Sequence, residues 1–252
     1  MSKSSAFIAL HGFGGSPEIF YKLAENLKLR KAIDEIWIPD LFKDLWSINT
    51  STVQQWVDSF LEEAKIRKFQ KPWIVGYSMG ARLALNALIS SPQSFEGAIL
   101  ISGAPGIWDK DAIKERENFE NLWSERFSSL EYEEYNTLWQ KQEIFSSTKS
   151  KNLRNDVSGQ ILAQAMISWS TCRHVFSKNQ LLDCSAKIIW LAGEDDKKYV
   201  KILSDLMKER GPGELKLISG AGHRLLEDNP KQVENIIFDF IKVSRDFKKE
   251  LG

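Results

Sequence analysis

The sequence predicts an α/β protein with a mostly parallel, doubly wound sheet and an all-helical insertion. Short apolar runs alternate with longer helical patterns along most of the 252 residues, an alternation typical of parallel sheets with helices on both faces. Residues 105–183 interrupt it, because they contain no convincing strand pattern. Hydrophobic residues make up 42% of the chain, enough to bury a sizeable core.

Six apolar runs are predicted strands, and four longer patterns are predicted helices. The strands are residues 7–10, 35–38, 73–75, 98–101, 188–191 and 215–218. For the first helix, residues 17–29, Ser16 is the expected N-cap and Pro17 takes the first helical position. The other helices are residues 52–69, 79–89 and 231–243.

The interruption at residues 105–183 is predicted to be a helical cap over a core formed by residues 1–104 and 184–252. It is charged, helical in pattern and rich in tryptophan: Trp108, Trp123, Trp139 and Trp169. A lid needs an apolar face because it covers a pocket. Some of these tryptophans are expected only to pack the cap together.

Composition and charge exclude several kinds of partner. Lysine plus arginine and aspartate plus glutamate both total 34, so nothing favours nucleic acid or an anionic membrane. The two cysteines, Cys172 and Cys184, suggest neither a metal site nor a disulfide framework. The apolar run at residues 6–10 is too short for a signal peptide, and no run is long enough to span a membrane. We therefore expect a cytoplasmic protein without a metal.

Residues 76–80 read GYSMG and fit the pattern G-x-S-x-G, with an apolar strand before and an apolar helix after. In this context the serine lies on a strained strand-to-helix turn that flanking glycines permit. Ser78 is the candidate nucleophile or base, and the N–H of Met79 becomes a candidate oxyanion donor. The plainer alternative is a polar residue in a structural turn.

A serine hydroxyl needs a histidine to accept its proton. His223 is the candidate because it lies in a glycine-containing loop between the last strand and the last helix; His11 is interpreted as structural, and His174 lies in the insertion. The orienting acid is expected after the preceding strand, where Asp196 is preferred and Asp195 is the alternative. The Phe13 N–H, in the loop after the first strand, is the second expected oxyanion donor.

With these residues the sequence resembles the α/β-hydrolase fold, and within it the 2-succinyl-6-hydroxy-2,4-cyclohexadiene-1-carboxylate synthases of menaquinone biosynthesis. The resemblance covers almost the whole chain. It depends on the segments HGFGGS, GYSMGARLAL, SGAPGI with Glu115-Arg116 after it, LWQKQEIF, STCRH, GEDDKKY and GAGH. Departures are IPDLF at residues 38–42, where hydrolases commonly have D-x-P-G-x-G, Ala81 in place of a glycine, and a single arginine, Arg116, where a pair is common.

The resemblance implies elimination rather than hydrolysis, without a cofactor. A base removes a ring proton, an enolpyruvyl group leaves as pyruvate, and a conjugated diene remains. The alternatives are an ester or thioester hydrolase with the same triad, and a binding protein with a vestigial one. A missing triad member would favour the last, and none is missing.

A polycarboxylate substrate requires cations in the pocket. Arg82 lies four residues beyond Ser78 on the same face of an otherwise apolar helix, where a guanidinium can meet a carboxylate; the plainer alternative is an exposed Arg82–Asn86 stripe. The resemblance also implies substrate contacts for Arg173, Arg116, Trp139 and Tyr77. Arg82 separates the hypotheses, because a hydrolase of neutral esters has no use for a cation there.

Overall fold

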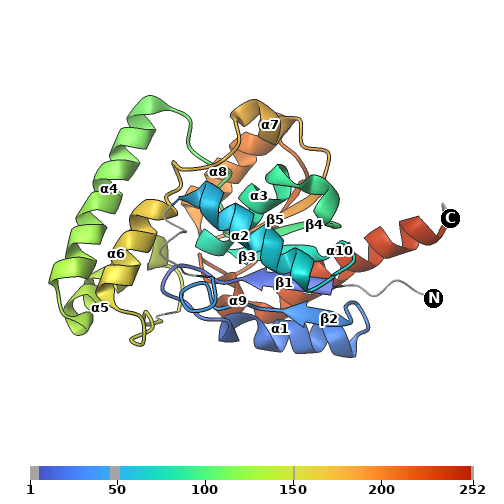
Figure 1. The fold of residues 1–252 in the computed structure, drawn as a ribbon, viewed down its shortest axis with the longest axis horizontal. Helices are drawn as coiled ribbons and strands as arrows, with labels where there is room; N and C mark the ends of the chain where they lie inside the picture. The colour runs from blue at the N-terminus through green and yellow to red at the C-terminus, as the bar shows by residue number, and fades with distance from the viewer. Residues whose placement is uncertain (1–5, 46–51, 150, 251–252) are drawn as a thin grey trace.

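The computed structural model describes residues 6–45, 52–149 and 151–250 and has one six-stranded sheet (Figure 1). Its strand order is β2-β1-β3-β4-β5-β6, and each neighbouring pair is parallel. The strands are β1 (Ala6–Leu10), β2 (Glu35–Trp37), β3 (Trp73–Tyr77), β4 (Gly97–Ile101), β5 (Lys187–Gly193) and β6 (Glu214–Ile218). All six predicted strands are therefore confirmed, with ends shifted by up to two residues.

The position of each strand in the sheet explains its composition. Every residue of β1, β3 and β4 is buried, so these strands read as continuous apolar runs. The outer strands β2 and β6 each include exposed residues.

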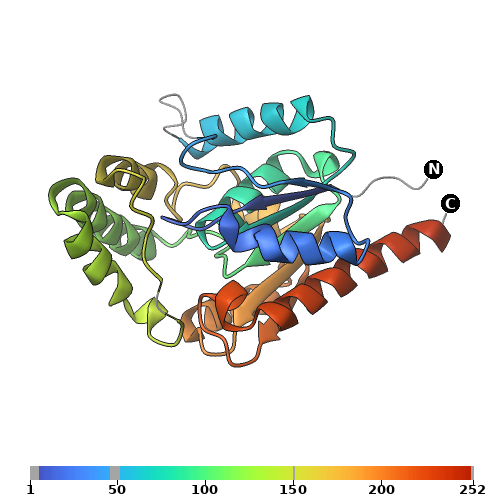
Figure 2. The same ribbon diagram turned by 90° about the horizontal axis from the view of Figure 1, so that it is seen from below.

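Helices cover both faces of the sheet, as the doubly wound prediction required (Figure 2). The helices α1 (Glu18–Leu29) and α10 (Pro230–Glu250) pack on one face. On the other lie α2 (Val53–Ile66), α3 (Met79–Ser90) and α8 (Lys197–Lys208).

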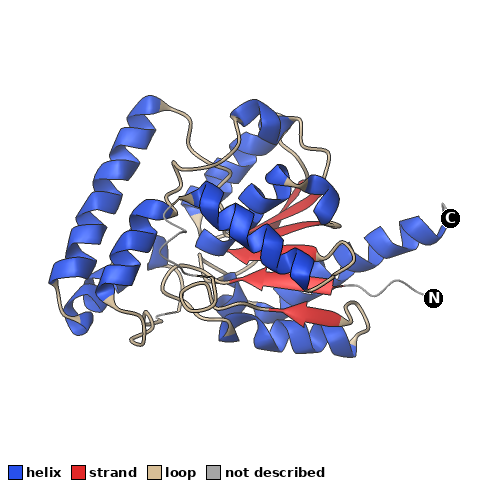
Figure 3. Ribbon diagram, in the orientation of Figure 1, coloured by secondary structure: helices blue, strands red, loops and turns tan. Residues whose placement is uncertain are grey.

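The insertion between β4 and β5 is helical, and its described residues contain no strand (Figure 3). It comprises α4 (Lys110–Ser129), α5 (Tyr132–Gln140), α6 (Gly159–Ser168) and α7 (Lys178–Leu182). The helices α4, α5 and α6 lie beyond the carboxyl ends of the strands (Figure 1). Trp123, Trp139 and Trp169 are buried, whereas Trp108 is only half-buried. The cap boundaries at 105 and 183 stay a prediction.

Helix ends differ from the prediction for local reasons. Pro17 is itself the N-cap of α1, so the helix begins one residue later than expected. Thr52 caps α2 in a capping box with Gln55, and the helix ends before Lys68, which has a φ of 58°. The short α9 (Leu225–Asp228) and the helix α8 were not predicted. Among the described residues, no helix is long and apolar enough to cross a membrane.

Candidate active site

Ser78 lies at the sharp turn between β3 and α3. Its φ of 53° and ψ of −110° are unusual for a residue with a side chain, a strain of about 1–3 kcal/mol. The turn is tight enough to require glycine on both sides. A Cβ on Gly76 would lie 2.3 Å from the Gly80 carbonyl oxygen, and one on Gly80 would lie 2.0 Å from that of Leu10. The fold therefore holds the Ser78 hydroxyl at the carboxyl edge of the sheet.

The structure brings Ser78, His223 and Asp196 together from three separate loops. The Ser78 Oγ is 3.0 Å from the His223 Nε2, and the His223 Nδ1 is 2.7 Å from an Asp196 carboxylate oxygen. With a proton on Nδ1 donated to Asp196, Nε2 is free to accept the proton of Ser78. His223 and Asp196 are both buried, which protects this arrangement from water.

The geometry selects Asp196 over Asp195 as the partner of His223. One oxygen of Asp196 accepts from the histidine, and the other accepts the Tyr199 N–H at 3.2 Å as the N-cap of α8. Asp195 is exposed instead, and its backbone carbonyl accepts from the Ser147 hydroxyl at 3.2 Å.

Two cavities meet at Ser78. The arginine cavity lies under the cap, and its wall includes Phe13, Ser78, Met79, Arg82, Arg116 and Tyr199. The loop cavity lies beside the turn at residues 12–16, and its wall includes Tyr77, Lys151, Asn152 and Arg224. Phe13, Ser78, Trp139, Phe145 and His223 line both. The residues whose N–H groups are expected to hold an oxyanion, Phe13 and Met79, thus share a cavity with the predicted base.

Arg82 reaches the arginine cavity from α3. Its Nη1 donates to the Trp169 carbonyl oxygen at 2.5 Å, and no described carboxylate forms an ion pair with it. Burial, with a further contribution from the positive charge of Arg116, lowers the pKa of Arg82 to about 10. The guanidinium is therefore still charged at neutral pH, and an anion in this cavity would stabilise it.

Arg116 enters the same cavity from α4. Its Nε donates to the buried carboxylate of Glu120 at 2.5 Å, and its guanidinium lies 4.9 Å from the centre of the Phe119 ring. One carboxylate thus accompanies two guanidinium groups, so this part of the cavity carries a net positive charge.

Arg173 is not brought into either cavity. Its N–H donates to the Ser170 carbonyl oxygen at 3.1 Å in a tight turn, its side chain is exposed, and Thr171 lines the arginine cavity instead. The described structure therefore gives no second cap arginine facing Ser78, contrary to the expectation for this position.

Trp139 and Tyr77 line cavities as expected. The buried Trp139 ring also packs on Phe13, Trp123 and Phe127, with centroid distances of 5.0, 4.8 and 5.5 Å, so it serves the cap core as well. Tyr77 lies against the loop cavity with its ring 5.9 Å from that of His223, and burial raises its pKa.

Sequence reasoning missed two side chains beside His223. The Tyr199 ring lies 4.8 Å from the His223 ring, and the signal for it was its place in GEDDKKY, three residues after Asp196. Arg224 is buried and donates to the Gln140 side chain at 2.9 Å and to the Lys149 and Lys151 carbonyl oxygens. These hydrogen bonds hold part of the insertion next to His223. The only sequence signal for this role of Arg224 was its position directly after His223.

A Ser–His–Asp arrangement at a strand-to-helix elbow, above the carboxyl edge of a parallel sheet, is that of the α/β hydrolases. A family model described as the alpha/beta hydrolase family matches residues 7–236, and the chain belongs to this family.

Curated relatives share a name. The chain is similar to 2-succinyl-6-hydroxy-2,4-cyclohexadiene-1-carboxylate synthase of Klebsiella pneumoniae subsp. pneumoniae, at 27% identity over 241 residues, 90% of this chain and 89% of the relative. It is similar to the synthase of an Enterobacter species at 26% identity over 197 residues, 76% of this chain and 73% of the relative.

Solved structures share the fold. MenH from S. aureus matches with a TM-score of 0.86 at 21% identity, covering 97% of this chain and 96% of that one. An esterase from Thermogutta terrifontis matches with a TM-score of 0.76 at 18% identity, covering 97% and 92%.

Proposed function

We propose that this protein is a cofactor-independent carbon–oxygen lyase. It eliminates pyruvate from 2-succinyl-5-enolpyruvyl-6-hydroxy-3-cyclohexene-1-carboxylate and leaves 2-succinyl-6-hydroxy-2,4-cyclohexadiene-1-carboxylate. The observation that carries the proposal is the convergence of Arg82 and Arg116 on one cavity with Ser78 and His223. The curated relatives, which carry the name of this synthase, support it.

In this proposal the triad acts as a base. His223, oriented by Asp196, accepts the proton of the Ser78 hydroxyl while the Ser78 oxygen removes a proton from the substrate ring. The C–H electron pair forms the enolate of the succinyl ketone, and its collapse to the diene breaks the bond to the enolpyruvyl oxygen. The departing enolate takes up the proton held by His223 and becomes pyruvate. Because Ser78 removes a proton and does not attack a carbonyl carbon, no acyl-enzyme forms.

The substrate is held by its charges. The N–H groups of Phe13 and Met79 are proposed to donate to the enolate oxygen, which carries most negative charge near the transition state. Arg82 and Arg116 are proposed to bind carboxylates, with Trp139 and Tyr77 lining the site. Arg173, exposed in this structure, stays a prediction, as do the cap boundaries and a cytoplasmic location.

A serine ester or thioester hydrolase is the second candidate. The fold it shares with the Thermogutta terrifontis esterase favours it, since the same triad serves acyl transfer. The partly buried Arg82, which forms no ion pair with a described carboxylate, argues against neutral esters, because a cation beside the nucleophile is costly unless an anion joins it.

The deciding experiment supplies purified protein with the enolpyruvyl substrate and measures pyruvate by a coupled dehydrogenase assay. We expect release that persists in a chelator and without any nucleotide. Fast cleavage of p-nitrophenyl esters with no pyruvate would establish the hydrolase instead, and absence of both activities would indicate a binding protein.

A further inference from the structure

The direction of one expected oxyanion donor, the Phe13 N–H, depends on the contacts of the carbonyl group in the same peptide unit. The Phe13 N–H belongs to the same peptide unit as the Gly12 carbonyl, and a planar trans peptide points these two groups in opposite directions. The Gly12 oxygen accepts the Gly15 N–H at 3.1 Å and lies 2.9 Å from the His11 Nδ1. Whatever holds the Gly12 carbonyl therefore also sets the direction of the Phe13 N–H.

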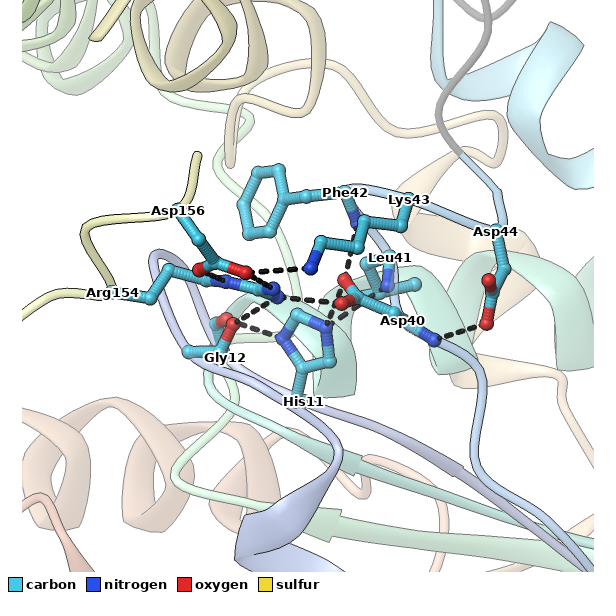
Figure 4. Close-up of polar contacts among 10 residues, drawn as sticks. His11, Gly12, Asp40, Leu41, Phe42, Lys43, Asp44, Arg154 and Asp156 are labelled. Carbon is cyan, nitrogen blue, oxygen red and sulfur yellow. Dashed lines mark hydrogen bonds and ion pairs between the residues drawn. The ribbon is translucent and has the colours of Figure 1, made fainter. Parts of the chain in front are cut away.

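His11 can hold that carbonyl in only one neutral tautomer. Its Nε2 accepts the Leu41 N–H at 2.9 Å, so the ring proton lies on Nδ1 and is donated to Gly12 (Figure 4). The ring is completely buried. The position of the Leu41 amide thus matters to the oxyanion turn.

The carboxylate of Asp40 organises the loop that supplies this amide. One of its oxygens accepts the Phe42 N–H at 3.0 Å and lies 3.6 Å from the His11 Nε2. The other accepts from the Arg154 Nη1 at 2.7 Å. Burial alone would raise the pKa of Asp40, but the hydrogen bonds from Arg154 and from the Phe42 N–H, with the positive charge of Arg154, outweigh burial and hold the pKa below its usual value. Asp40 is therefore ionised and paired.

Arg154 comes from the insertion and contacts this arrangement from the cap side. Its Nε and Nη2 bind the two oxygens of Asp156 at 2.7 Å each, which leaves Nη1 for Asp40 (Figure 4). Its backbone N–H donates to the Gly14 carbonyl at 3.0 Å, and Nη1 lies 3.4 Å from the Gly15 carbonyl. One cap residue thus contacts both the oxyanion turn and the carboxylate behind it.

We propose that Arg154 is a positioning residue that couples the seating of the cap to the direction of the Phe13 N–H, acting through Asp40 and the Gly14–Gly15 turn. The oxyanion donor is then aligned only when the cap chain at residues 152–156 is docked. The proposal rests on the proposed function only in requiring negative charge to develop beside Phe13, which ester hydrolysis also does.

Lysine cannot replace Arg154 in this role. A single ammonium is a point charge, whereas the arginine fork meets two carboxylates and a carbonyl at fixed angles. The variant Arg154→Lys keeps the charge and loses that geometry. It separates a positioning role from simple charge balance.

The first test compares kcat and KM for pyruvate release by Arg154→Ala, Arg154→Lys, Asp40→Asn and the double variant Arg154→Ala/Asp40→Asn. We expect kcat to fall about 10- to 100-fold in Arg154→Ala, as when an oxyanion donor is weakened, with KM changed less than about threefold. Arg154→Lys should recover little. The double variant should be hardly worse than the stronger single variant, because both changes break one connection.

The matched control is the ion pair of Lys178 and Glu209, which joins α7 of the insertion to the end of α8 at 2.6 Å but does not contact the oxyanion turn. Lys178→Ala should leave kcat within about twofold. Additive effects in the double variant, or a lower melting temperature with normal kcat per folded molecule, would overturn the proposal.

The second test does not depend on activity. Hydrogen exchange of the Gly15 amide, which is bonded to the Gly12 carbonyl, should be at least about tenfold faster in Arg154→Ala and in Asp40→Asn. It should be unchanged in Lys178→Ala. Unchanged exchange in both network variants would contradict the proposal even if the protein releases no pyruvate, and that absence of pyruvate would count only against the lyase function.

Discussion

Two arginines of this protein, Arg82 and Arg154, have opposite surroundings. Arg82 faces the arginine cavity, has a backbone carbonyl as acceptor and forms no ion pair with a described carboxylate, and its pKa is lowered to about 10. The Arg154 guanidinium, 11% exposed, binds the carboxylates of Asp40 and Asp156, and its pKa is raised, chiefly by the hydrogen bonds to Asp156.

This difference in ion pairing indicates that Arg82 binds a ligand and that Arg154 supports the fold. An unpaired cation away from water destabilises the fold, so its presence is explained best by a ligand that completes it. A cation whose donors are already used cannot take a ligand without losing those bonds, so Arg154 is suited to hold the fold in place. Ion pairing thus separates Arg82 from Arg154, although both are arginines.

The largest effect on activity is expected from changes to the predicted base itself, Ser78 and His223. Ser78→Ala and His223→Ala should each lower pyruvate release by at least about 10³-fold, and the double variant should lose little more, because the residues act as one unit. Steady-state assays with matched circular dichroism spectra check this. Additive losses would mean that the two side chains act separately.

Arg82→Ala should weaken substrate binding without reducing stability. Loss of a charge-assisted hydrogen bond to a carboxylate should lower kcat/KM for the anionic substrate about 10- to 100-fold. Cleavage of a neutral p-nitrophenyl ester should change much less, and the melting temperature should not fall. Equal losses on both substrates, or a clear loss of stability, would place Arg82 with the structural cations.

Asp40→Asn should, in contrast, reduce stability. We expect a loss of about 1–3 kcal/mol at pH 7, because the change leaves Arg154 partly unpaired in a largely buried site. The folded-state pKa of Asp40 is depressed, so its contribution is complete above about pH 4, its ordinary pKa, and is lost as the pH falls through the lower folded value. Urea unfolding from pH 7 to pH 2 should show the two proteins converging in acid, and a constant difference would contradict this.

The smallest effect is expected at the outer edge of the same network. Lys43 binds Asp156 at 2.6 Å with both side chains about half exposed. Lys43→Ala should change the free energy of unfolding by less than about 0.5 kcal/mol, as is usual for solvated pairs, and should not affect kcat. A larger loss by urea unfolding would extend the supporting region to the surface.

The parallel core and the Ser78 elbow could be predicted from sequence because their signals are local. Apolar runs indicated the strands, and two glycines around a serine indicated the turn. The helix α8 was missed although Asp196, its N-cap, precedes an amphipathic pattern. That capping role is also the physical signal that would have favoured Asp196 over Asp195.

The network around Arg154 could not be predicted, because no local pattern relates Asp40 to a residue 114 positions away. The exposure of Arg173 could not be predicted for a different reason. A motif can transfer a residue type to a position, but it does not determine the exposure of that residue, which here lies in a turn where its N–H donates to the Ser170 carbonyl oxygen.

The insertion between β4 and β5 has a consequence for synthesis of the chain. Gly97 pairs with Lys187 in adjacent strands, so the middle of the sheet cannot close until the ribosome has produced the entire cap. Ser78 is therefore synthesised before Asp196 and His223, while one edge of β4 is still unpaired. Nascent chains of this protein should depend on protection of that edge far more than the finished molecule does.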